Sequence, residues 1–371
     1  MSRENLKEQR FAMFLHYVDD ILIASMDQRF LSAFFERMKE KFDIEVKPRA
    51  DWYLQTRIQQ DKDGNLTLDQ TRYTKAMITR FLPTFASEEP SDKDKKKYAD
   101  PLKTNMIMRK EDRSSNHAEV VELEQEFGFR FIDVVGCFNW IANTCYEEIY
   151  AIRKLCRFMS LPGRNHFTAA RHLLHHFRCH PPRPLIFYQD LENSPVATML
   201  KKVPGMDFDM LYVVFAESSH ADSDGARSTA CDLHVLQGGL VDHMSWVPNV
   251  VPMSTAEPEN NCYSVAAMRT RFIAKAVFKI LFDDPDFDYT VPICMDSQAA
   301  IQMNESDNPI RRTRHIESRY WYGRLLRERA LIAFIKVDGK EEQPADVGTK
   351  ITLSEDSAFY HGLFEAPYYV T

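Results

Sequence analysis

The order of apolar runs after residue 210 constrains the fold more than any other feature of the chain. Three strand-like runs follow one another directly, with the sequences LYVVFA, CDLHVLQ and LVDHMSW. Next come a long helical pattern (257–282), the run TVPICM and a short helical pattern. They are followed by a further helical pattern (317–329), the run LIAFIKV and a short helix near Asp346. Consecutive strands followed by alternating helices and strands predict a mixed sheet flanked by helices.

Two polar stretches divide the chain into regions. At 371 residues, and with about 150 residues per domain as a prior, two or three domains are expected. The stretch SEEPSDKDKKKYAD at 87–100 is almost wholly charged or turn-forming, and a second break lies near 195–207. We therefore expect an α+β segment (1–86), a charged linker (87–126) and a helical segment (127–194). A second linker (195–210), an α/β sheet domain (211–353) and a tail (354–371) should follow.

Composition narrows the class of protein. Hydrophobic residues make up 44% of the chain and charged residues 27%, which is typical of a globular protein rather than a disordered one. No apolar run approaches the roughly 18 residues of a membrane span, and the charged start MSRENLKEQR is unlike a signal peptide, so a soluble intracellular protein is expected. The net charge of −7 argues against phosphate binding over the whole surface but allows a local basic groove. The 7 scattered cysteines, with no CxxC spacing, predict reduced thiols.

Near the N-terminus, FLHYVDDILIAS has the pattern of a strand, a turn and a second strand, with Asp19 and Asp20 at the tip. Adjacent aspartates at a hairpin tip suit ordinary turn chemistry. They also suit Mg²⁺, which prefers hard oxygen ligands and, as a pair of ions, serves phosphoryl-transfer enzymes. The residue types alone leave both interpretations open.

YVDD followed by ILIAS resembles the catalytic hairpin of reverse transcriptases, and its sequence is most similar to that of Copia-type long-terminal-repeat retrotransposons. KFDIEVKPRADWYLQTRI and LTLDQTRYTKAMITRF resemble the primer-gripping hairpin and the start of the thumb, and the segment 135–178 is similar to the family's helical stretch. Five later segments resemble the ribonuclease H motifs of the family and follow the family's order. They are RSTACDLHVLQGG, MSTAEPE, CMDSQAAI, NPIRRTRHIESR and QPADVGTK.

The resemblance implies the second half of a polymerase palm with the start of a thumb (1–86), a helical thumb or connection (127–194) and a ribonuclease H-like domain (211–353). It implies Mg²⁺ as cofactor in two-metal sites, with the catalytic carboxylates Asp19, Asp20, Glu217, Glu257, Asp296 and Asp346 as ligands. Taken singly, each of the last three also fits a helix-terminus role, because Ser254 and Glu257 match a capping box, Asp296 an N-cap and Asp346 the positive end of a helix dipole.

The helical segment carries a basic run in which Arg164, Arg171 and Arg178 are candidates for binding a nucleic-acid duplex. A solvated helix face is an equally good interpretation. The same segment contains four histidines, His172, His175, His176 and His180. Their spacing superficially suggests zinc, but the glutamate of an HExxH motif is missing.

The chain also departs from the family. The palm aspartate that should precede the hairpin is absent from the residues before Tyr17, so we expect this chain not to extend a primer by itself. The family's Asp-x-Asp-Trp motif is replaced by Glu217, Ser219 and His220, and the extra methylene of Glu217 is expected to displace its carboxylate and to leave hybrid cleavage weak or absent.

Two interpretations of function remain. The first is a polyprotein fragment, with an incomplete RNA-directed DNA polymerase and a ribonuclease H acting on RNA–DNA hybrids. The second is a non-catalytic remnant that keeps the fold and at most binds nucleic acid. An unrelated metal nuclease would leave the YVDD hairpin unexplained. The implied partners are a template–primer duplex or RNA–DNA hybrid and the rest of the polyprotein, in cytoplasmic virus-like particles and without a membrane.

Overall fold

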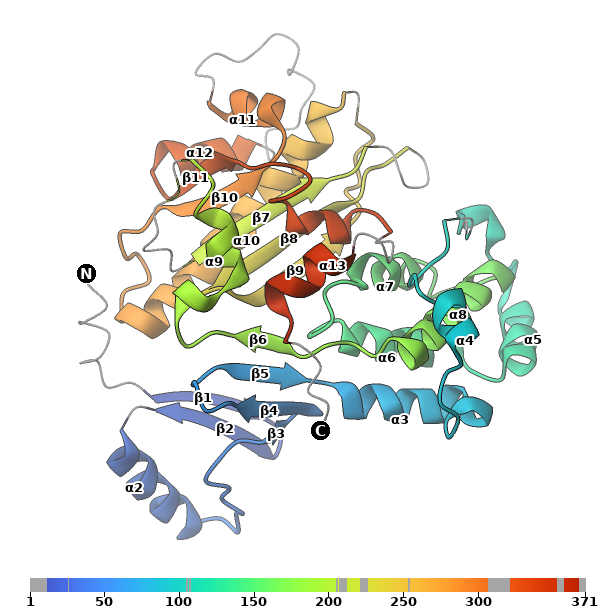
Figure 1. Cartoon of the computed structure of the whole chain (residues 1–371), viewed down its shortest axis with the longest axis horizontal. Coiled ribbons are helices and arrows are strands. Elements are labelled where there is room, and N and C mark those ends of the chain that lie inside the picture. Colours follow the sequence, from blue (N-terminus) through green and yellow to red (C-terminus); the bar gives the residue numbers. More distant parts are fainter. Residues whose placement is uncertain are drawn as a thin grey trace.

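The structure is a computed structural model that describes residues 12–25, 27–104, 106, 108–204, 206, 212–220, 226–252, 254–305, 321–351 and 357–366. It combines helices with three sheets, which confirms the expected α+β class (Figure 1). All 7 cysteines are unpaired, as their spacing predicts. None of the described helices has both the length and the apolar character that crossing a bilayer requires.

The N-terminal hairpin is a separate two-stranded sheet. Strands β1 (Ala12–Tyr17) and β2 (Asp20–Ser25) pair antiparallel, and helix α2 (Gln28–Lys39) packs beside them. Phe14 contacts Phe30 and Phe34 of this helix with ring centroids 6.3 and 5.1 Å apart. No residue of either strand is buried, so the hairpin adds little to the core.

A four-stranded antiparallel sheet lies next to the hairpin (Figure 1). Three of its strands are close in sequence, namely β3 (Trp52–Tyr53), β4 (Thr56–Gln60) and β5 (Leu66–Asp69). The fourth strand, β6 (Leu185–Phe187), comes from beyond the helical region and pairs with β5. The N-terminal segment and the end of the helical segment are therefore joined by a shared sheet.

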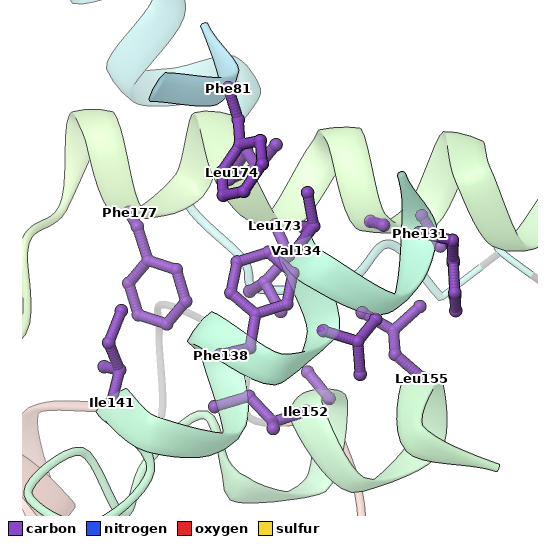
Figure 2. Packing of buried hydrophobic residues seen from close by; sticks show 14 of the residues in the cluster. Phe81, Phe131, Val134, Phe138, Ile141, Ile152, Leu155, Leu173, Leu174 and Phe177 are labelled. Carbon is purple, nitrogen blue, oxygen red and sulfur yellow. The ribbon is translucent and has the colours of Figure 1, made fainter. Parts of the chain in front are cut away.

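The helical region has its own apolar core. Helices α3 (Thr71–Phe81), α6 (Phe131–Ile141), α7 (Ile149–Cys156) and α8 (Arg164–Cys179) surround a cluster of aromatic and branched side chains. Figure 2 shows Phe138 and Phe177 facing each other in this cluster, with ring centroids 5.6 Å apart. Burial of such rings contributes roughly 1.5–3 kcal/mol each.

The segment expected to be a solvated charged linker is partly folded. It contains helix α4 (Asp92–Lys97), a 3₁₀ turn (Lys110–Asp112) and most of helix α5 (His117–Phe127), and another 3₁₀ turn (Pro83–Phe85) precedes it. Both helices pack against α8. The reason is local: Ser91 and Asn116 cap the two helices, and Leu102 and Met108 between them are buried in the helical core.

A five-stranded sheet forms the C-terminal part, as the pattern of apolar runs predicted. Its spatial order is β11-β10-β7-β8-β9. The strands are β7 (Tyr212–Ser218), β8 (Ala230–Leu236), β9 (Gly239–Trp246), β10 (Val291–Met295) and β11 (Ile332–Lys336). The first three pair antiparallel, whereas β10 runs parallel to both β7 and β11, so the sheet is mixed.

Alternate residues of β7 face opposite layers, with Val214 in one core cluster and Phe215 in the other. The long helix α10 (Ala256–Phe282), with α11 (Gln298–Glu305) and α12 (Tyr322–Glu328), covers the first face. The second face is covered by α9 (Pro195–Leu200), the 3₁₀ segment η6 (Pro344–Gly348) and α13 (Ser357–Phe364). The second expected linker thus begins with a buried helix, and a further 3₁₀ turn (Leu191–Asn193) precedes it.

Candidate metal centre

Three carboxylates from three different elements meet at one edge of the five-stranded sheet. Glu217 lies near the end of β7, Asp296 directly follows β10, and Glu259 lies in the first turn of α10. One ligand oxygen from each lies within 4.8 Å of the others. This is the one group of three metal-ligating side chains found among the described residues.

The register of the sheet explains this convergence. Strands β7 and β10 are parallel, and Val214 pairs with Ile293 while Phe215 pairs with Cys294. Continuing that register by two residues places Asp296 opposite Glu217. Because parallel strands end at the same edge of a sheet, the two acids are brought together by strand pairing alone.

Burial and the neighbouring negative charges raise the pKa of Glu217 and of Glu259. Burial, followed by the negative charges of Glu259 and Asp296, raises the pKa of Glu217 to about 11. Burial likewise raises the pKa of Glu259 to about 8, although the Tyr263 hydroxyl, which donates to its Oε2 at 2.7 Å, opposes the rise. A divalent cation at this site would have to displace protons from these groups.

The residues fit a divalent cation. Glu217 is 7% exposed, and its Oε2 is buried without a hydrogen-bond partner among the described residues. An unsatisfied buried carboxylate oxygen beside two further carboxylates is costly unless it binds a proton or a cation. Hard oxygen ligands of this kind suit Mg²⁺ or Mn²⁺. The extra methylene of Glu217 therefore does not keep its carboxylate out of the cluster, contrary to the displacement expected from the sequence.

Asp346 lies beside the cluster, on η6. Its charge helps to raise the pKa of Glu217, which places it within electrostatic range of the three acids. Lys350 donates to Asp346 Oδ2 at 2.6 Å. The side chain of Asp346 is 18% exposed, so this acid is less buried than Glu217.

Glu257 is not part of the cluster, and Glu259, which the sequence interpretation missed, is. The two residues lie two positions apart on one helix, so their side chains point in nearly opposite directions. Glu259 lies three and four residues before Cys262 and Tyr263, both of which are buried against the sheet. That helical periodicity was the signal for choosing Glu259 within the motif AEPE.

The capping roles considered for Glu257 and Asp296 are not observed, whereas Asp346 does lie in the first turn of η6. The N-cap of α10 is Thr255, which makes no side-chain cap hydrogen bond, and Ser254 does not form a box with Glu257. Near α11, the side chain that accepts from the Ala300 amide is that of Ser297 rather than Asp296, at 3.4 Å. Asp296 is thus left available to the cluster. The motif at 308–319 lies outside the described residues.

Asp19 and Asp20 lie at the tip of the β1–β2 hairpin and are exposed. The residue before them, Val18, has a left-handed backbone with φ of 51°, which is strained for a β-branched residue. Within the part of the chain that is described, neither aspartate belongs to a group of three potential metal ligands.

The three arginines of α8 do not form a free basic face. Arg164 forms a bidentate ion pair with Glu126, with one N···O distance of 2.6 Å. Arg171 donates to the carbonyl of Phe127, and Arg178, whose side chain is 6% exposed, donates to the carbonyl of Glu88 at 3.2 Å. These cations hold α8 against the segment 88–127, so the predicted duplex contact at this helix has no geometric support.

The histidines of α8 have structural roles as well. His172, His176 and His180 bond to the carbonyl oxygens of Asp100, Tyr98 and Lys95 at 3.0, 2.8 and 2.9 Å. His175 stacks on the Tyr98 ring with centroids 4.6 Å apart. A ring nitrogen of His172, of His176 and of His180 is thus engaged by a carbonyl, and none of the four histidines belongs to a group of three potential metal ligands among the described residues.

One comparison with known proteins agrees with the motifs. No protein-family model matches the chain. The retrovirus-related Pol polyprotein from transposon TNT 1-94 of Nicotiana tabacum is 23% identical over 356 residues, which cover 94% of this chain and 24% of that protein. The chain thus spans about a quarter of the length of that relative. Among solved structures, LC11-RNase H1, isolated from compost, is 12% identical and covers 38% of this chain and 94% of its own, with a TM-score of 0.26. The Pol similarity confirms the resemblance to a retrotransposon Pol polyprotein.

Proposed function

We propose that this relative of a retrotransposon Pol polyprotein hydrolyses the RNA strand of RNA–DNA hybrids at the acid cluster, using divalent metal ions. The observation that carries the proposal is the meeting of Glu217, Glu259 and Asp296 within 4.8 Å at one sheet edge. Four carboxylates, counting Asp346, are about the number that a two-metal phosphodiester site requires.

Each acid has a distinct part in this proposal. Glu217 and Asp296, fixed by adjacent strands, and Glu259, oriented by Tyr263, would hold the cations. Bound cations supply an activated water and compensate the negative charge that develops on the phosphate. Asp346, more exposed than Glu217 and bonded to Lys350, would orient a water or accept its proton.

We further infer that the hairpin with Asp19 and Asp20 is part of a reverse-transcriptase palm, followed by a helical thumb or connection. Its support is the sequence resemblance and the exposed pair of acids at the tip of an antiparallel turn. A polymerase site would need another carboxylate beside them, so this chain by itself is expected not to extend a primer. Its partners would be the nucleic acid and the rest of a polyprotein, in a cytoplasmic particle.

A cleavage assay tests the nuclease proposal. The chain is incubated with a labelled RNA–DNA hybrid, with single-stranded RNA and with duplex DNA of the same sequence, in Mg²⁺, in Mn²⁺ and in EDTA. We expect slow cleavage of the RNA strand of the hybrid alone, faster with Mn²⁺, whose geometric demands are looser, and none in EDTA. Binding of the hybrid without cleavage under every condition would instead support the non-catalytic remnant.

A further inference from the structure

A strongly basic pocket lies between the helical region and the five-stranded sheet. Its volume is about 370 Å³, which is within the range of ligand pockets. Six of its lining residues are cationic and none is acidic, and the cations are Lys110, Arg113, Arg153, Lys154, Arg157 and Arg227. In a chain with a net charge of −7, such a concentration of positive charge is a specific feature of this place.

The pocket draws its walls from both parts of the molecule. Helix α7 supplies Arg153, and the turn at Lys110–Asp112 supplies Lys110, while Thr229 and Ser245 come from the sheet side. Helix α7 packs against β9 and η6, which fixes the two walls relative to each other. The pocket is therefore a product of the way the helical region docks on the sheet.

Several of these cations lack an anionic partner. Among the described residues, no carboxylate forms an ion pair with Lys110, Arg113 or Arg153. Nε of Arg113 and Nε of Arg153 are buried and have no hydrogen-bond partner there. Arg113 donates to the carbonyl of Arg157 and Arg153 to Asn139 Oδ1, so both groups are hydrogen-bonded but neither is neutralised. Partly buried guanidinium groups without a carboxylate partner favour an anion, and guanidinium matches the oxygen geometry of phosphate.

The sheet places this pocket close to the acid cluster. Glu217 pairs with Cys231, and Cys231 pairs with Ser245, so the three residues form one row across β7, β8 and β9 and share a face. Two strand spacings of about 4.8 Å put Ser245 about 10 Å from Glu217. The Ser245 hydroxyl also donates to the Gly348 carbonyl at 2.6 Å, at the end of the segment that carries Asp346.

That separation suits a nucleic-acid strand. A nucleic-acid strand carries a phosphate at every nucleotide, so a strand that lies at the acid cluster can also reach a pocket about 10 Å away. From these observations we propose that the pocket binds the phosphate backbone of the nucleic-acid duplex whose RNA strand lies at the acid cluster. The position of the duplex rests on the proposed function, whereas the affinity of the pocket for a phosphate backbone does not.

Binding measured in EDTA separates this inference from catalysis. The affinity of the full chain for a fluorescent RNA–DNA hybrid is titrated between 50 and 200 mM salt, for the unaltered chain and for the double variant Lys110→Gln with Arg153→Gln. Each lost phosphate contact lowers the slope of log K against log salt by about 0.9, so we expect a slope smaller by about 2 and weaker binding at low salt. Thermal unfolding of the double variant shows whether it is still folded, so loss of binding through unfolding is distinguished from loss of phosphate contacts.

Two controls complete the experiment. The double variant Lys93→Gln with Lys96→Gln removes the same charge from the exposed face of α4, and we expect it to keep the slope. Arg153→Lys retains the charge and should restore most of the affinity. A slope unchanged in a folded pocket variant, or lowered equally by the α4 variant, overturns the inference. The inference is also overturned if the pocket binds inorganic phosphate but the pocket substitutions leave the affinity for the hybrid unchanged. Intact, pocket-dependent binding without cleavage would contradict the nuclease proposal only.

Discussion

Replacing Glu217 with glutamine is expected to stabilise the metal-free protein at neutral pH. The pKa of Glu217 is about 11 in the folded chain against an ordinary 4.5. At pH 7 the unfolded chain therefore carries an ionised Glu217, whereas the folded chain must hold it protonated. Folding consequently takes up a proton, and the free energy of unfolding falls as pH rises above 4.5.

The size of this penalty follows from the interval between pH 4.5 and pH 7. About 2.5 pH units at 1.36 kcal/mol each give a cost of about 3 kcal/mol. Glutamine cannot ionise, so Glu217→Gln removes this cost, although its amide must still be accommodated in a buried site. We expect a net gain of about 1–3 kcal/mol at pH 7, which disappears as the pH is lowered to 4.5.

Urea unfolding in EDTA at pH 7 and at pH 4.5 measures the difference. The matched control is Glu328→Gln, since Glu328 is an exposed glutamate paired with Arg324 on α12. Its effect should stay below about 1 kcal/mol at both pH values. Destabilisation by Glu217→Gln at pH 7, or a gain that is the same at both pH values, would refute the account of the buried acids.

Two further substitutions test the surroundings of the site and the helical core. A Cβ at Gly339 would lie 2.6 Å from Asp296 Oδ2, so Gly339→Ala should displace that carboxylate and weaken Mg²⁺ binding, measured by calorimetry, at least tenfold. The control is Gly136→Ala, at an exposed helical position where a Cβ would have nothing within 4 Å. It should leave Mg²⁺ binding unchanged and raise the free energy of unfolding by about 1 kcal/mol. Equal metal affinity in both variants would contradict the packing described at Asp296. Burial lowers the pKa of His175 from 6.5 to about 4, so the folded chain loses stability as pH falls from 6.5 towards 4. Phenylalanine can keep the stacking on Tyr98 but cannot take up a proton. In urea unfolding, His175→Phe should therefore reduce the loss of stability between pH 7 and pH 5 by about 2 kcal/mol. An unchanged pH dependence would show that His175 is solvated.

Local patterns were sufficient for the C-terminal sheet. Its strands are continuous apolar runs, and α10 has a long helical pattern, so element type and order could be predicted before any contact was known. The pairing of β6 with β5 could not be predicted, because β6 has three residues and its partner lies more than a hundred positions earlier. Short strands with distant partners leave little trace in a local pattern.

The candidate site shows the same division. Glu217 and Asp296 were implied by the family resemblance, and both lie at the ends of strands, where strand pairing fixes their side chains. The choice between Glu257 and Glu259 depended on which side of α10 faces the sheet, and the motif contained both residues. On α8 the sequence displayed the charge of Arg164 and Arg178 but not their partners, which lie 38 and 90 positions away.

The role of Glu259 in the acid cluster is tested most directly by comparing Glu259→Gln with Glu257→Gln in Mg²⁺-dependent cleavage of the RNA strand of a hybrid. Both variants remove one negative charge from the first turn of α10, so the net charge changes alike. If Glu259 joins Glu217 and Asp296 around the cations, Glu259→Gln abolishes cleavage, while Glu257→Gln retains it. Loss of cleavage in Glu257→Gln with activity retained in Glu259→Gln would contradict the metal centre described above.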